Sequence, residues 1–415
     1  MPLDLHAPSR RALVAASGLL FAWPFVPRLA LAEGRDPRLL VVVLRGALDG
    51  LALAAPVGDP DWIALRGDKA LTLDGKTPGL PLDGFFALNP AMPNLHRLYK
   101  AGHAILVHAA ATPYRERSHF DGQDVLESGL PKPGAAATGW LNRAFGAIEP
   151  AARIDPKSAL AVGPVTPLVV RGPAPVLTWT PQRIAPASED TLLRLIDLYQ
   201  HADPALARVL QGRLGLMHIA AAGAMDALTP PAQPEQQPVG LAAVRAYFAD
   251  AAGTAAKFMA RPDGPRLGAL SLNGWDTHVD EGAVMGRLAN TLGALDGAIA
   301  AIEAGMGAAW GETVVALVTE FGRTARINGD NGTDHGQGTV ALLIGGALKG
   351  GRVIANWPGL KVADLYEARD LKPTTDLRAV LKGLLKDHLR VEDRALTADI
   401  FPGSDTVAPI GNLLA

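Results

Sequence analysis

The chain has 415 residues, of which 48% are hydrophobic and 19% charged, a composition typical of a globular protein rather than a disordered one. The formal net charge is −2, so no basic excess favours binding to nucleic acid or anionic lipid. The absence of cysteine excludes disulfides, thiol catalysis and cysteine-ligated metal centres. A bound metal would need His, Asp, Glu or carbonyl ligands, which suit zinc, magnesium, manganese or calcium.

Residues 1–32 have the pattern of an export signal. Arg10 and Arg11 precede an apolar run from Ala12 to Phe25, and residues 30–32 form an A-x-A cleavage signal. The run is shorter than the roughly 20 residues that cross a bilayer, so we expect a cleaved leader and no stable membrane anchor. The arginine pair resembles a twin-arginine signal, which predicts use of the twin-arginine export machinery, cleavage after Ala32 and a periplasmic or secreted protein. The alternative is an ordinary secretory leader.

Residues 33–415 are predicted to form one α/β domain. Apolar, β-branched runs predict strands that are buried on both faces of a parallel sheet, at residues 39–44, 104–108, 267–272, 313–319 and 339–344. Helical periodicity is clear over residues 284–303, and residues 374–389 are predicted to form a covering helix. Residues 150–240 are interpreted as a mostly helical insertion that ends in a proline-rich stretch.

The first groups of candidate site residues follow the first two predicted strands, where open α/β sheets bind ligands. Asp49 lies in a glycine-flanked turn after the first strand, and its alternative role is to cap a helix or turn. After the second strand, two arginines, two hydroxyls and a histidine lie close together in the sequence. Arginine suits phosphate or sulfate, and a helix that begins near residue 118 would add amide donors. The alternative is a capped helix start with solvated charges. These residues are Thr112, Arg115, Arg117, Ser118 and His119.

The later strands are followed by carboxylates and histidines that could converge on one ion. Asp276 and His278 are two apart in an extended segment and therefore face the same side. Glu320 follows the next strand, and Asp334 and His335 form a second carboxylate and imidazole pair among glycines.

Together these clusters resemble the domain-of-unknown-function 1501 family, exported bacterial proteins grouped with the alkaline phosphatase and sulfatase superfamily. The matching stretches run in order from about residue 38 to 390: RGALDGL at 45–51, SHFD at 118–121, GWDTH at 274–278, EFGRT at 320–324 and GTDHG at 332–336. The resemblance implies a three-layer sandwich of the alkaline phosphatase type, with a mostly parallel sheet between helices and a metal centre at its strand ends. It also implies metal ligands at Asp49, Asp276, His278, Glu320 and His335, with Asp334 orienting His335.

The chain departs from the superfamily pattern at the nucleophile. Sulfatases carry Cys or Ser followed by x-Pro-x-Arg, and Ala111 stands at that position here. Covalent catalysis would then have to use Thr112 or Ser118, whereas the alternative is attack by metal-activated water. Arg115, Arg117 and His119 are expected to contact the substrate.

The leading hypothesis is an exported, divalent-metal-dependent hydrolase that acts on a small phosphate, phosphonate or sulfate ester. The rival is a periplasmic or surface protein that keeps the fold for binding or assembly without catalysis. Catalysis of an unrelated reaction on the same scaffold also remains open, because a fold does not fix a function.

Overall fold

The structure, a computed structural model, describes residues 35–134, 136–148, 159–163, 165–179 and 240–415, with scattered positions between 195 and 212. The predicted leader lies outside the described residues, as does most of the predicted insertion. Residues Asp36–Ala415 cluster as one unit.

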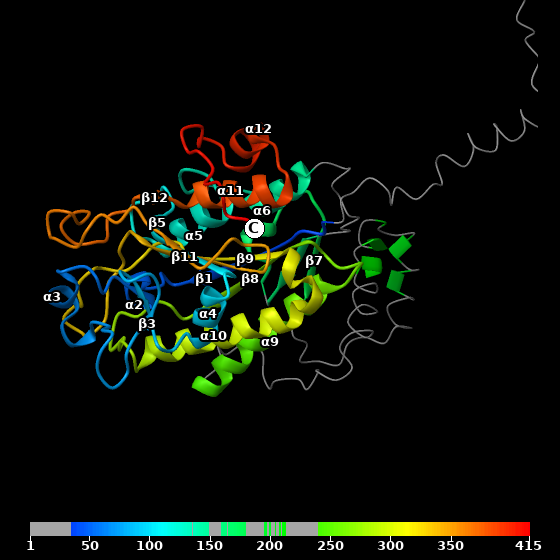
Figure 1. Cartoon of the computed structure of the whole chain (residues 1–415). Coiled ribbons are helices and arrows are strands. Elements are labelled where there is room, and N and C mark those ends of the chain that lie inside the picture. The colour runs from blue at the N-terminus through cyan, green and yellow to red at the C-terminus, as the bar shows by residue number, and fades with distance from the viewer. Residues whose placement is uncertain are drawn as a thin grey trace, which may run out of the picture. The chain divides into compact units, whose positions relative to one another are not determined.

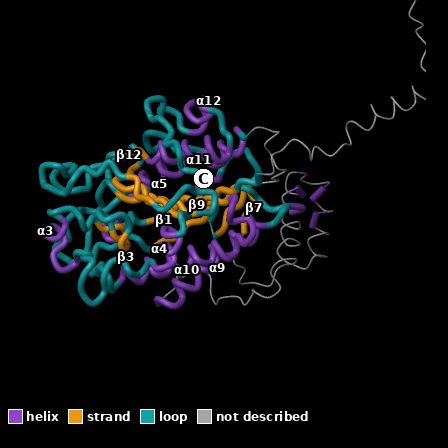
Figure 2. The backbone as a smooth tube through the Cα atoms, in the orientation of Figure 1, coloured by secondary structure: helices purple, strands orange, loops and turns teal. Residues whose placement is uncertain are grey.

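A nine-stranded sheet is the centre of this unit (Figures 1 and 2). Its strand order is β11-β5-β10-β9-β1-β8-β6-β7, and β12 pairs with β5. Neighbouring strands are parallel except that β10 is antiparallel to both β5 and β9. The bounds are β1 Arg38–Arg45, β5 Ala104–Ala111, β6 Ala159–Val162, β7 Val176–Trp179, β8 Leu267–Asn273, β9 Thr313–Val318, β10 Thr339–Ile344, β11 Arg352–Ile354 and β12 Thr375–Asp376. The predicted apolar runs are all strands of this sheet.

Helices cover both faces of the sheet, so the predicted three-layer α/β sandwich is confirmed. Side chains alternate along β1: Leu40, Val42 and Leu44 pack on one face, whereas Leu39 and Val41 pack on the other. In Figure 1, α9 and α10 lie on one side of the sheet and α6 and α11 on the other. The helices are α2 Gly50–Leu53, α3 Trp62–Arg66, α4 Pro93–Lys100, α5 His119–Ser128, α6 Trp140–Ala147, α9 Leu241–Ala260, α10 Arg287–Met306, α11 Leu377–Leu389 and α12 Asp393–Ala395. Shorter turns of helix are Gly67–Lys69, Leu168–Val170, Gly307–Glu312 and Leu396–Ile400.

Residues 287–312 are long and apolar enough to cross a membrane. Leu288, Leu292 and Leu295 of this stretch are nevertheless fully buried in the core that α10 shares with α9. The apolar character of α10 is therefore explained by its place in the core.

The described part of residues 150–240 adds strands to the sheet as well as helical turns. Strands β6 and β7 extend the sheet beyond β8, because short apolar runs such as ALAV pair readily with an open parallel edge.

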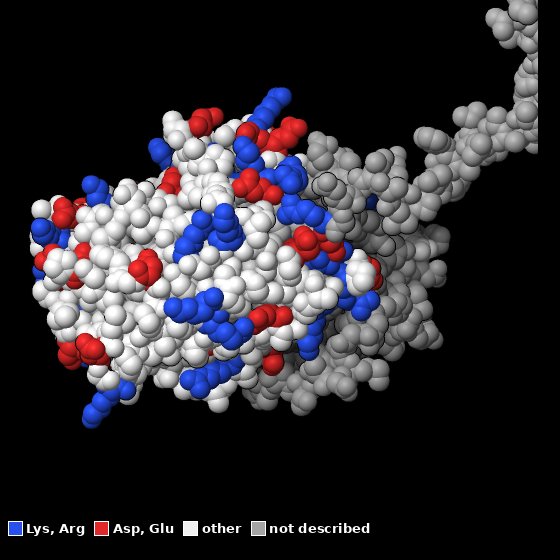
Figure 3. All heavy atoms as spheres, in the orientation of Figure 1, with Lys and Arg blue, Asp and Glu red and all other residues white. Residues whose placement is uncertain are grey.

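A small second sheet, in the order β2-β4-β3, is built from Ala54–Ala55, Ala87–Leu88 and Leu80–Pro81. On the face shown in Figure 3, basic and acidic side chains are interspersed.

The direction of β10 determines which loops meet. Because β10 runs against its neighbours, its amino end lies at the same edge of the sheet as the carboxyl ends of β1, β5, β8 and β9. The segment just before Thr339 therefore joins the loops that follow those four strands.

Candidate metal centre

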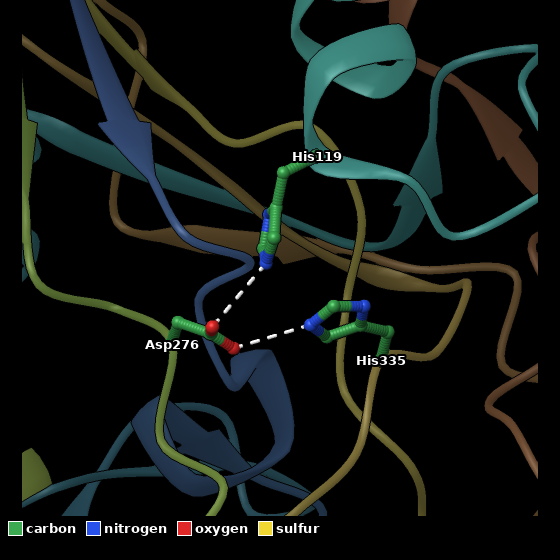
Figure 4. Close-up of side chains that lie close together, drawn as sticks. All are labelled: His119, Asp276 and His335. Atoms are coloured by element: carbon green, nitrogen blue, oxygen red, sulfur yellow. Dashed lines mark hydrogen bonds and ion pairs between the residues drawn. The ribbon is translucent and has the colours of Figure 1, made fainter.

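Three histidines from different segments of the chain surround the carboxylate of Asp276 (Figure 4 shows His119, Asp276 and His335). His278 Nε2 lies 2.9 Å and His335 Nε2 3.2 Å from Asp276 Oδ1, and His119 Nε2 lies 3.5 Å from Oδ2. Donor atoms of His119, Asp276 and His335 all fall within 4.8 Å of one another. His278 Nε2 is also only 3.0 Å from His335 Nε2. We call His119, Asp276, His278 and His335 the histidine cluster.

The other ring nitrogen of His119 and of His335 faces a group that can only accept a hydrogen bond. Nδ1 of His119 lies 2.8 Å from Glu320 Oε1, and Nδ1 of His335 lies 2.9 Å from the carbonyl oxygen of Arg117. A proton on Nδ1 satisfies each contact, which leaves the Nε2 lone pair free.

His278 follows the same rule. Its Nδ1 lies 3.2 Å from Asp334 Oδ1, and Asn328 donates a hydrogen bond to that same oxygen at 3.1 Å. Asp334 therefore orients His278, whereas the resemblance implied that it orients His335.

The cluster has the donor set of a transition-metal site. The three Nε2 lone pairs point toward one carboxylate, and the buried Nε2 of His119 makes no hydrogen bond with the described residues. Lone pairs of His278 and His335 at 3.0 Å would repel each other unless a proton or cation lay between them. Imidazole nitrogens and carboxylate oxygens are common ligands of divalent metal ions, so these residues fit a bound metal.

Arg323 is a site residue that the sequence analysis missed. Its fully buried guanidinium donates a hydrogen bond to Asp276 Oδ1 at 2.6 Å and is itself held by Thr333. Burial would raise the pKa of Asp276, but the hydrogen bond and charge of Arg323 outweigh it and lower that pKa. Asp276 is therefore ionised at neutral pH.

Glu320 lies behind His119 rather than in the cluster. Its carboxylate accepts hydrogen bonds from His119 and from Gly46 N at 2.9 Å and Gln123 Nε2 at 3.1 Å. Burial would raise the pKa of Glu320, but these donors lower it, and the hydrogen bond to Glu320 raises the pKa of His119. The ring of Phe321 stacks on His119 with centroids 5.1 Å apart. Glu320 and Phe321 thus position His119.

The structure places Asp49 in a buried ion pair instead of the cluster. Its two carboxylate oxygens accept hydrogen bonds from Arg66 at 2.5 and 3.1 Å, and Oδ1 also accepts from Ala52 N at 3.1 Å. Asp49 is the N-cap of α2, which is the alternative role that its turn suggested.

Thr112, Arg115 and Ser118 lie in the loop that leads into α5. The Thr112 hydroxyl is buried and donates a hydrogen bond to the carbonyl oxygen of Glu320 at 3.4 Å. Arg115 donates hydrogen bonds to carbonyl oxygens of its own loop. Ser118 is the N-cap residue of α5, without a side-chain capping bond.

Arg117 reaches the site through its backbone. Its guanidinium pairs with Asp370 at 2.7 Å and Glu367 at 2.5 Å, whereas its carbonyl holds His335. The φ angle of Arg117 is +61°, a left-handed conformation that non-glycine residues rarely adopt. The guanidinium of Arg117 is thus paired with carboxylates of the protein itself.

A pocket of about 480 Å³ opens beside the cluster. Its lining includes the ends of β1 and β8, part of α5 and the start of α10. The lining residues are Arg45, Gly46, His119, Gln123, Asn273, Gly274, Asp276 and Arg287. None of these described lining residues carries a hydroxyl or thiol.

Fold and site together define an α/β sandwich with a candidate mononuclear metal centre at the carboxyl edge of its sheet. The chain belongs to the family described as "Protein of unknown function (DUF1501)", whose model matches residues 102–400. A search of curated proteins finds no match.

Solved structures with a similar chain trace include several proteins of low sequence identity. A PsFucS1 sulfatase from Pseudoalteromonas sp. is 12% identical, with a TM-score of 0.39, and the alignment covers 97% of this chain and 75% of that one. The C-terminal periplasmic domain of EcEptC from Escherichia coli, in complex with Zn, is 12% identical, with a TM-score of 0.36 and coverage of 76% and 74%. A protein in the alkaline phosphatase superfamily from Vibrio parahaemolyticus is 12% identical, with a TM-score of 0.32 and coverage of 81% and 68%.

Proposed function

We propose that this chain is an exported, metal-dependent hydrolase of a phosphate, phosphonate or sulfate ester. The observation that carries the proposal is the convergence of three histidine Nε2 atoms on the Asp276 carboxylate, beside an open pocket. Export is inferred from the sequence of residues 1–32 alone.

His119, Asp276, His278 and His335 would hold the divalent cation. When bound, such an ion activates water as a nucleophile and polarises an ester oxygen. Arg323 keeps Asp276 ionised and fixes its orientation through a hydrogen bond of 2.6 Å. Hydrogen bonds to Nδ1 keep the three rings turned with Nε2 toward the carboxylate.

Water is the nucleophile that the pocket favours. The lining has no serine, threonine or cysteine among its described residues, and the Thr112 hydroxyl is directed to the carbonyl of Glu320. Hydrolysis then adds the hydroxyl of water to phosphorus or sulfur and its proton to the departing alcohol. Neither Thr112 nor Ser118 lines the pocket, which supports attack by water over covalent catalysis by either hydroxyl.

Metal analysis of the purified full chain, with an ester panel assayed after restoring each metal, tests the proposal. Asp276→Ala and His335→Ala should lose both the ion and the metal-dependent hydrolysis. His96→Ala is the matched control, because His96 is a partly buried histidine outside the cluster whose ring contacts Pro81 O. Protein that binds no divalent metal, or hydrolysis that survives in both cluster variants, would contradict the proposal. Metal binding without hydrolysis of any ester would favour the non-catalytic rival.

A further inference from the structure

Two arginines from different elements line the pocket. Arg45 ends β1 and is paired in register with Asn273 at the end of β8, whereas Arg287 begins α10. Both line the same pocket as His119 and Asp276. The pocket lining thus combines His119 and Asp276 of the cluster with two arginines.

Arg45 is held in place but not satisfied. Its Nη2 lies 2.5 Å from Glu127 Oε1, and Glu127 is anchored by the amide of Val169 at 3.1 Å. The Nε atom of Arg45 is buried and has no hydrogen-bond partner among the described residues. The side chain as a whole is nevertheless 28% exposed and lines the pocket, so an acceptor that entered the pocket could reach it.

Arg287 is an exposed cation whose guanidinium forms no hydrogen bond or ion pair with the described part of the chain. The only acidic side chain among the lining residues is Asp276, and Arg323 already pairs with it. The charge of Arg287 is therefore available to a ligand. Arg117, which pairs with Asp370 and Glu367, does not line the pocket.

We propose that Arg45 and Arg287 form an oxyanion-binding subsite that receives an anionic group of the substrate, a phosphate or sulfate. Planar guanidinium groups match such oxyanions because each can donate two parallel hydrogen bonds. The subsite assigns substrate recognition to these arginines rather than to Arg115 and Arg117. Its role in catalysis rests on the proposed hydrolase function, but its binding of an oxyanion can be measured without hydrolysis.

Calorimetric titration with inorganic phosphate and with sulfate tests the subsite, in zinc-loaded and in chelator-treated full-length protein. Arg287→Gln should weaken binding about tenfold or more, because it removes charged hydrogen bonds. Arg45→Lys should weaken it similarly while leaving a cation for Glu127, so that the fold is preserved. Arg394→Gln is the matched control, because Arg394 is an exposed arginine of α12 and lies outside the pocket lining.

Each outcome separates the subsite from the hydrolase. Unchanged phosphate and sulfate affinity in Arg287→Gln and Arg45→Lys would overturn the subsite even if metal-dependent hydrolysis is found. Absence of phosphate and sulfate binding to the wild-type protein in both states would also overturn it. Arginine-dependent phosphate binding in a protein that holds no metal would keep the subsite and contradict the hydrolase.

Discussion

Glu320 accepts a hydrogen bond from Nδ1 of His119 at 2.8 Å, although the two residues are 201 positions apart in the sequence. A carboxylate behind a metal-binding imidazole fixes its tautomer and raises its basicity. Glu320→Gln keeps the shape but removes the charge, so we expect metal affinity to fall roughly 10- to 100-fold. Competition with a chromophoric chelator measures the change. An unchanged affinity would show that Glu320 does not support the metal site.

Two variants of Asp49 test whether its carboxylate is structural or binds the metal. Asp49→Ala leaves the fully buried Arg66 without its partner, and we expect the free energy of unfolding to fall by about 3–5 kcal/mol. Asp49→Asn keeps a capping acceptor and should fold with its metal content unchanged. Urea denaturation and metal analysis measure the two effects. Loss of the ion from folded Asp49→Asn protein would restore Asp49 as a ligand.

Gly46 lies where the backbone of the β1 loop touches the segment after β8. A Cβ at this position would lie 2.7 Å from the amide nitrogen of Asp276, and the φ of Gly46 is +118°. Gly84 also has a positive φ, +90°, but a Cβ there would have no neighbour within 4 Å. Gly84→Ala therefore measures the cost of the backbone conformation alone. We expect Gly46→Ala to cost more unfolding free energy than Gly84→Ala and also to weaken metal binding. Equal costs in urea denaturation and normal metal binding would show that the close approach is not needed.

The raised pKa of Glu281 predicts that the stability of the fold depends on pH. Burial and the nearby charge of Asp49 raise its pKa to about 7, against the opposing charge of Arg66. The folded state therefore binds the proton more tightly than the unfolded chain. Protonation of Glu281 therefore contributes up to about 3 kcal/mol to the free energy of unfolding. This contribution is fully present below about pH 4.5 and is lost as the pH rises through about 7.

Glu281→Gln, which mimics the protonated form, checks this assignment. In metal-free protein the variant should match the wild type at pH 4.5 and exceed it in unfolding free energy at pH 8. Urea denaturation at both pH values measures the difference. A gap that is independent of pH would contradict a raised pKa for Glu281.

The fold could be predicted largely because its central strands are buried on both faces. Runs such as LLVVVL at residues 39–44 have no polar face, so they stand out without knowledge of their neighbours. The direction of β10 could not be predicted, since a buried apolar run has the same pattern in a parallel and an antiparallel pair.

The cluster was predicted in part. Asp276, His278 and His335 were expected as ligands and lie together. His119 was expected to contact the substrate, and it both joins the cluster and lines the pocket. A helix start does not reveal which loop its first side chain faces.

Arg323 was missed although it lies inside the motif at residues 320–324. Nothing local to that motif signals an ion pair with a residue 47 positions away. Asp49 was ambiguous because a capping aspartate and a metal ligand have the same local sequence pattern.

The central claim is that His119, Asp276, His278 and His335 hold one divalent ion. Anomalous diffraction from crystals soaked in zinc tests it most directly. We predict one strong peak about 2.0–2.2 Å from Nε2 of the three histidines and from a carboxylate oxygen of Asp276. The absence of a peak at the cluster, or a peak at Asp49 instead, would contradict the account.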